Sequence, residues 1–149
     1  MRAILVGILL ICWFDSTISR LEKKDFGKEL LKHVDRWHTI CRRITGASEA
    51  QIDKVYNGTF PEGDDALQRY TYCIWNLGGQ MDIDMKMNQT QLWVYIPDMH
   101  KADVVHYMKC NTDARQLPNK NHVQKVWEMQ KCIQKTVDNE VSKISYFRL

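Results

Sequence analysis

The chain has 149 residues, of which 44% are hydrophobic and 26% charged, with 3 Pro and 7 Gly. This composition is typical of one globular domain and excludes a disordered or collagen-like chain. The net charge of +3 is too small for the concentrated basic face that phosphate recognition needs, so we expect no nucleic-acid partner.

The first residues of the chain have the pattern of a secretory signal peptide. Arg2 supplies a positive charge, and an uninterrupted run of 12 apolar residues is followed by small and polar residues. A transmembrane anchor needs about 20 apolar residues, so this run is too short to span a bilayer. The small residues Thr17 and Ser19 favour cleavage after Ser19. We therefore expect a signal peptide at 1–19 and one secreted, soluble domain at 20–149.

Apolar residues recur at steps of three or four along most of this domain, which is the helical period. The first such stripe spans residues 21–44 and ends at Gly46, a residue type that often caps helix C-termini. Ser48 and Gln51 then have the spacing of a capping box. They predict a second, short helix that runs to about Asn57.

Four more helices are predicted after residue 57. One is capped by residues 63–65 and reaches about Leu77, and the others span about 90–95, 99–110 and 122–139. Residues 80–91 alternate Met or Ile with Asp or Lys, a period of two that normally suggests a strand. Because the chain has no other strand to pair with it, we expect an extended loop there.

Four cysteines remain after the signal peptide and its Cys12 are removed: Cys41, Cys73, Cys110 and Cys132. In an oxidising compartment these four would form two internal disulfides. They include no CxxC pair and have no histidine at zinc-ligand spacing, so we expect no metal site and no cofactor. The spacing alone leaves all three ways of pairing open.

Catalytic motifs are absent from the sequence. It contains no GxSxG, HExxH, P-loop or GxGxxG, and its five histidines have no companion nucleophile or carboxylate motif. Asp82 and Asp84 resemble the start of a calcium loop, but Lys86 and Met87 stand where an oxygen ligand and a glycine are needed. We therefore expect the protein not to be an enzyme.

Large apolar side chains are abundant, with 5 Trp, 6 Tyr, 4 Phe and 7 Met. Short helices joined by disulfides tend to enclose space, and a cavity walled by Met and aromatic residues suits a small apolar ligand. Plain core packing explains the same stripes. The predicted fold is all-α, a compact disulfide-linked bundle of about six short helices around an apolar cavity.

The cysteine spacing resembles that of insect odorant-binding proteins of the pheromone and general odorant-binding family. The four cysteines are similar in position to the first, third, fourth and sixth of the family's six, with 31 and 36 residues in the first two gaps. The second and fifth family positions fall on Arg69 and Val123. Since the family pairs those two cysteines with each other, the chain resembles the four-cysteine "Cys-minus" subclass. The resemblance implies the bonds Cys41–Cys73 and Cys110–Cys132.

The resemblance also implies a function. It is that of a secreted carrier, which binds small hydrophobic ligands such as odorants or pheromones reversibly and transports them through aqueous lymph. The implied partners are the small ligand and an olfactory receptor in a membrane, with the carrier a monomer or a weak homodimer. Helical phase directs these candidate ligand-binding residues toward the cavity: Ile74, Leu77, Met81, Met85, Leu92, Tyr95, Val105, Met108, Val126, Trp127, Gln130 and Ile133, with Phe147 from the C-terminal tail. Tyr95 and Gln130 would orient a ligand hydroxyl or carbonyl by hydrogen bonding.

Two alternative functions stay open at this stage. A helical cytokine-like signalling protein would also be secreted and carry two disulfides, although such bundles use four long helices. A lipid-binding secretory protein on the same scaffold would differ from an odorant carrier only in its ligand and tissue. The sequons at Asn57 and Asn88 are candidate glycosylation sites under any of these readings.

Overall fold

The structure is a computed structural model that describes residues 23–137. This part of the chain is all-α, as predicted, with six α-helices and two short 3₁₀ turns. The elements are η1 (Lys23–Asp25), α1 (Lys28–Thr45), α2 (Glu49–Tyr56), α3 (Asp65–Leu77), α4 (Gln89–Tyr95), η2 (Asp98–Asp103), α5 (Val104–Arg115) and α6 (His122–Thr136). Among these residues, no helix combines the length and apolar composition that a membrane crossing requires. The expected signal peptide lies outside the described residues.

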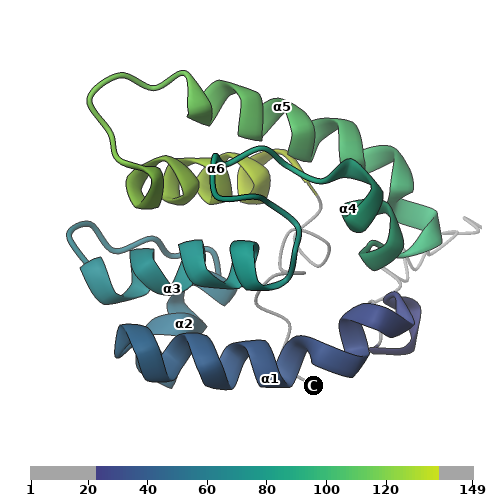
Figure 1. Cartoon of the computed structure of the whole chain (residues 1–149), viewed down its shortest axis with the longest axis horizontal. Coiled ribbons are helices and arrows are strands. Elements are labelled where there is room, and N and C mark those ends of the chain that lie inside the picture. Colours follow the sequence, from purple (N-terminus) through teal and green to yellow (C-terminus); the bar gives the residue numbers. More distant parts are fainter. Residues whose placement is uncertain (1–22, 138–149) are drawn as a thin grey trace, which may run out of the picture.

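Five of the helices form a closed ring. α1 packs against α3, α3 against α6 and α6 against α5, while α4 contacts both α5 and α1 and so completes the circle. Figure 1 shows the order from α5 at the top through α6 and α3 to α1 at the bottom, with α4 at one end. The buried apolar side chains form one cluster to which every one of these helices contributes. The ring therefore encloses a single apolar interior.

The short helix α2 is joined to this ring by side-chain hydrogen bonds. The Gln134 amide of α6 donates to the Val55 carbonyl of α2 at 2.9 Å. The Gln51 amide of α2 donates to both carboxylate oxygens of Asp64, the residue that caps α3. These bonds fix the outer helix against both α3 and α6.

The predicted caps at Gly46 and at Ser48 with Gln51 are present, and the structure adds a second capping box at the start of α6. Ser48 and Gln51 form a reciprocal capping box at the start of α2, and Asn121 and Gln124 form another at the start of α6. Each box satisfies two backbone N–H groups that a helix start leaves without partners. Gly46 ends α1 in the left-handed conformation, with φ of 76°.

Residues 80–88 form a small hairpin rather than an open loop. The Asn88 amide donates to the Gln80 carbonyl at 2.8 Å, and the Asp82 amide donates to the Lys86 carbonyl at 3.0 Å. The Asp82 carboxylate also accepts the backbone N–H of Lys86, which stabilises the turn. Met81, Met85 and Met87 are buried, whereas Ile83 at the tip is 76% exposed. The alternation of apolar and polar residues therefore reflects a half-buried hairpin, in which one half of the segment hydrogen-bonds to the other.

The fifth helix begins later than predicted. The sequence suggested a helix over 99–110, but residues 98–103 form the 3₁₀ turn η2 and the α-helix starts at Val104. Pro97 precedes this turn, and its carbonyl accepts the His100 amide in a tight bond of 2.9 Å. Within α5, Val104 and Tyr107 are buried, and Val105 is 63% exposed.

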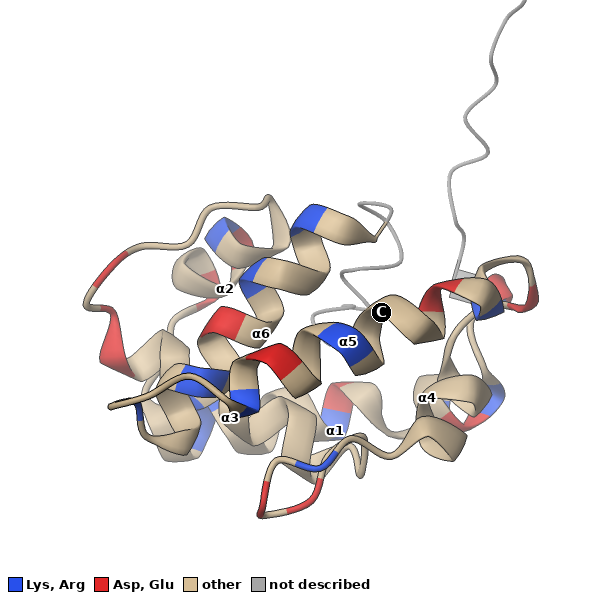
Figure 2. Cartoon of the chain, turned by 90° about the horizontal axis from the view of Figure 1, so that it is seen from above, with Lys and Arg blue, Asp and Glu red and all other residues tan. Residues whose placement is uncertain are grey.

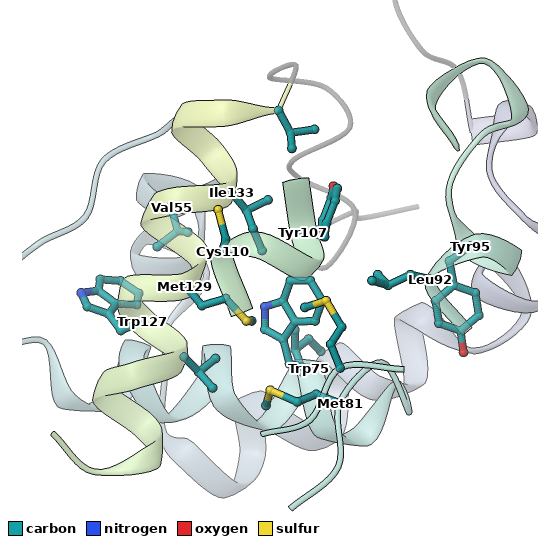
Figure 3. Close-up of a cluster of buried hydrophobic side chains, with 14 of the residues drawn as sticks. Val55, Trp75, Met81, Leu92, Tyr95, Tyr107, Cys110, Trp127, Met129 and Ile133 are labelled. Carbon is teal, nitrogen blue, oxygen red and sulfur yellow. The ribbon is translucent and has the colours of Figure 1, made fainter. Parts of the chain in front are cut away.

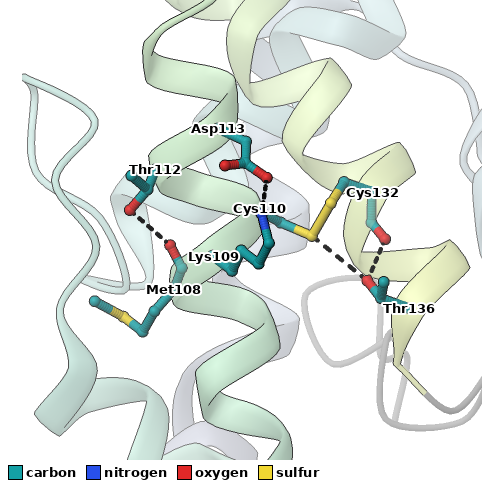
Figure 4. Close-up of polar contacts among 7 residues, drawn as sticks. All are labelled: Met108, Lys109, Cys110, Thr112, Asp113, Cys132 and Thr136. Atoms are coloured by element: carbon teal, nitrogen blue, oxygen red, sulfur yellow. Dashed lines mark hydrogen bonds and ion pairs between the residues drawn. A yellow bond between two sulfur atoms is a disulfide. The ribbon is translucent and has the colours of Figure 1, made fainter.

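Two disulfides join neighbours in the ring. Cys41 on α1 is bonded to Cys73 on α3, and Cys110 on α5 is bonded to Cys132 on α6, each with Cα atoms 5.7 Å apart. These are the two pairings that the family resemblance implies. Figure 4 shows the second bond between its helices, with the Thr136 hydroxyl 3.5 Å from the Cys110 sulfur.

Candidate functional site: the interior of the helical ring

Trp75 of α3 lies at the centre of the interior and is fully buried. Figure 3 shows Met81 and Met129 beside its indole ring. The ring of Tyr107, from α5, lies 6.3 Å from that of Trp75 between centroids, at a tilted angle. Thioethers and aromatic faces therefore surround the centre, which is the lining that adapts best to apolar molecules of different shapes.

A buried hydrogen bond crosses the interior between α3 and α6. The Trp75 indole N–H donates to the Gln130 side-chain oxygen at 3.0 Å, and both residues are fully buried. Nearby, the Asn111 amide donates to the Met85 carbonyl at 2.8 Å and lies 3.3 Å from the Met129 sulfur. These contacts place amide groups among the apolar walls, where they can orient a polar atom of a guest.

Two buried tyrosines also face this region. The Tyr95 hydroxyl donates to the Gly78 carbonyl at 2.9 Å. Burial raises the pKa of Tyr95, with an opposing hydrogen bond from Gln91 and a further increase from the charge of Glu29. Burial, and then the charge of Asp103, hold the pKa of Tyr107 well above its ordinary value. Burial therefore favours the uncharged form of both hydroxyls.

Charged side chains lie over the outside of the molecule in mixed sign. Figure 2 shows Lys and Arg interspersed with Asp and Glu along the helices. Nowhere in residues 23–137 do three His, Cys, Asp or Glu side chains come together as a metal site would need.

Residues 23–136 match the family of pheromone and general odorant-binding proteins, described as the PBP/GOBP family. This chain belongs to the PBP/GOBP family. No curated protein sequence matches it. Among solved structures, it is similar to odorant-binding protein 7 from Anopheles gambiae, which has four disulfide bridges and was solved in complex with an azo compound. The two are 27% identical, with a TM-score of 0.60 over 76% of this chain and 89% of the mosquito protein.

Most of the candidate ligand-binding residues of this PBP/GOBP member lie in the interior. The following are at most 4% exposed: Ile74, Met81, Met85, Leu92, Tyr95, Val126, Trp127, Gln130 and Ile133. Met108 is half-buried against the same cluster. Burial is also what core packing would produce, so contact with a ligand stays a prediction for each of them.

Two candidates lie outside the interior. Val105 is 63% exposed on α5, and Leu77 is 41% exposed at the end of α3. Phe147 lies outside the described residues. Trp127 is buried but packs edge-on against Phe60, with ring centroids 5.1 Å apart.

Two central residues, Trp75 and Tyr107, are not among the candidates from the sequence. The apolar stripe predicted for residues 65–77 passes through Ile74, the neighbour of Trp75, and no apolar stripe was defined for the fifth helix, which carries Tyr107. A signal for Trp75 does exist, since a buried Trp needs a partner for its N–H and Gln130 lies on the inward stripe of α6.

Proposed function

We propose that this PBP/GOBP protein is a secreted carrier that binds small hydrophobic ligands reversibly inside the ring of helices and transports them through aqueous lymph. The observation that carries the proposal is the closed ring α1–α3–α6–α5–α4 around a buried cluster rich in Trp, Tyr and Met side chains. The azo compound bound by the similar mosquito protein supports a small organic ligand.

Binding in such an interior requires no covalent chemistry. Burying about 500 Å² of apolar ligand surface would contribute about 12 kcal/mol. About 4 kcal/mol of this gain is offset by the lost freedom of the ligand, which leaves about 8 kcal/mol, the free energy of micromolar affinity. The ligand would be admitted by rearrangement of the buried methionines, and a ligand hydroxyl or carbonyl would replace one of the internal partners of Gln130 or Tyr95.

The secreted state is proposed from the leader pattern and from the disulfides, which persist in oxidising compartments. The two sequons, which would be glycosylated during secretion, differ in their surroundings. Asn57 is exposed at the end of α2, whereas the Asn88 side-chain oxygen accepts the Gln91 amide as the cap of α4. Glycosylation at either site, and delivery to an olfactory receptor, are parts of the same proposal.

The test is titration of the refolded domain 20–149 with an environment-sensitive fluorescent naphthylamine, followed by displacement with volatiles and fatty alcohols. We expect saturable micromolar uptake and competitive displacement. Met85→Ala, which enlarges the interior, should change the ranking of ligands by size, whereas Met99→Ala on the surface should not. Absence of uptake with both disulfides formed would refute the carrier and favour the cytokine-like function.

A further inference from the structure

A groove of about 560 Å³ opens on the outside of the ring, between the end of α1, the face of α3 and the start of α6. Its apolar wall is formed by Ile44, Tyr72, Leu77 and Val123, and Arg69 lies at its polar side. The groove lies on the outer side of α3, while Ile74 and Trp75 of the same helix are buried in the ring. It is therefore separate from the interior site.

The groove lies where the family resemblance places the missing third disulfide. Both Arg69 and Val123, which stand at the family's second and fifth cysteine positions, line it. No covalent bond joins α3 to α6 through these two residues, since the two disulfides use other cysteines. The hydrogen bond from Trp75 to Gln130 joins α3 to α6 inside the ring. It lies one to two helical turns after Arg69 on α3 and after Val123 on α6.

The apolar wall of the groove is unusually open to water. Ile44 is 65% exposed and Leu77 is 41% exposed, and both belong to the same hollow. Large apolar side chains that are exposed together, rather than singly, mark surfaces that bind a partner or ligand. The volume lies within the range of about 300–1,000 Å³ that is typical of small-molecule sites.

The polar side of the groove holds one cation, Arg69. Among the described residues that line it, Arg69 alone is charged. Its guanidinium pairs with Asp65 one turn earlier on α3, and both side chains are largely exposed, at 49% and 71%. An exposed ion pair of this kind contributes at most about 1 kcal/mol, and a guanidinium has N–H groups to spare. A second carboxylate can therefore share or replace Asp65.

We infer that this groove is a second ligand site, for a small amphiphile with a carboxylate head and an apolar chain. The head would be held by Arg69 and the chain would cover Ile44, Leu77 and Val123. A dissolved fatty acid of medium length has this chemistry. The neutral tyrosines and amides of the interior favour uncharged guests, so the two sites would differ in the charge of the ligand that they accept.

The test uses decanoate, 1-decanol and acetate as probes of the ¹⁵N-labelled domain, followed by amide chemical shifts. We expect decanoate to shift residues of the groove and to bind there at least five-fold more tightly than decanol. Arg69→Gln should remove this preference and leave decanol binding unchanged. Leu77→Glu should weaken both probes in the groove at least ten-fold, whereas Val105→Glu, an exposed site elsewhere, should change neither.

Several results would overturn the inference. Decanoate shifts confined to the interior would show that the groove is empty of ligand, and an unchanged preference in Arg69→Gln would exclude the proposed head-group contact. Shifts at Arg69 that acetate reproduces in full would show nonspecific anion binding only. Naphthylamine uptake measures binding in the interior separately. Uptake without decanoate shifts in the groove would support the carrier alone, and decanoate shifts in the groove without uptake would support the groove site alone. Arg69 and Leu77 are exposed, so these variants should fold.

Discussion

At the scale of single residues, the buried polar groups distinguish this interior from an ordinary apolar core. Apolar packing alone would not require Gln130, which is fully buried on α6, or Asn111, which is 3% exposed on α5. A buried amide costs free energy unless it is hydrogen-bonded, and here both have identified partners. These residues therefore fix the relative positions of the helices and offer the polar atoms that a ligand could use.

The Trp75–Gln130 hydrogen bond can be measured by a double-mutant cycle. Trp75→Phe leaves the Gln130 oxygen without this donor, and we expect the free energy of unfolding to fall by about 1–3 kcal/mol beyond the loss of packing. Gln130→Leu should also lower the free energy of unfolding, because it leaves the buried Trp75 N–H without this acceptor. The double variant should be less destabilised than the sum of the two, as determined by urea unfolding. Strict additivity would show that the bond does not couple α3 to α6.

Tyr107 predicts how stability depends on alkaline pH. Burial, and then Asp103, raise the pKa of its hydroxyl well above the ordinary 10.0. Below pH 10 both folded and unfolded states keep the proton, so the stabilising effect is fully present. As the pH rises above 10 the unfolded state releases the proton first, and stability is lost. Tyr107→Phe should therefore reduce the fall in unfolding free energy above pH 10, measured by urea unfolding at several pH values.

Tyr95→Phe serves as a second variant for the same measurement. Burial also raises the pKa of Tyr95, so this change should reduce the alkaline loss of stability as well. If neither variant alters the dependence on pH above 10, the protonation of these two hydroxyls does not determine alkaline stability.

At the scale of elements, the sequence predicted helix ends best where a capping motif marks them. Ser48 with Gln51 predicted the start of α2, because a capping box is a local interaction between residues three apart. The phase of α5 could not be predicted in the same way. No local motif marks the residue at which η2 ends and α5 begins, since the two elements adjoin without a loop. Val105, a candidate for the interior, is 63% exposed.

Restoring the third cross-link would test what its absence does. Arg69→Cys with Val123→Cys would place both cysteines at the groove that these residues line. If the bond forms, α3 and α6 become less free to separate, and we expect displacement of the naphthylamine to become restricted to fewer ligands. Each single variant, with its thiol blocked, is the control. A third disulfide with unchanged ligand selectivity would show that the missing bond has no effect on the range of ligands.

At the scale of the whole molecule, the ring is completed where the start of α1 meets the end of α4. The Gly27 amide donates to the Tyr95 carbonyl at 3.1 Å, and a Cβ at residue 27 would lie 1.9 Å from the Val94 carbonyl oxygen. The family resemblance predicted the fold and both disulfides. It could not reveal this contact, because nothing in the sequence distinguishes Gly27 from other glycines until residues 27 and 94 are brought together.

Gly27→Ala should therefore open the ring at this contact. Backbone atoms must move apart to admit the methyl group, which we expect to cost about 1–3 kcal/mol of unfolding free energy. Gly46→Ala is the matched control, since Gly46 has φ of 76° and no atom near its would-be Cβ, so its cost of about 1–2 kcal/mol is local backbone strain. In stopped-flow dissociation of the naphthylamine, Gly27→Ala should release the dye faster than Gly46→Ala at similar stability. Equal rates would mean that ligands leave the interior by a route that does not involve the junction of α1 and α4.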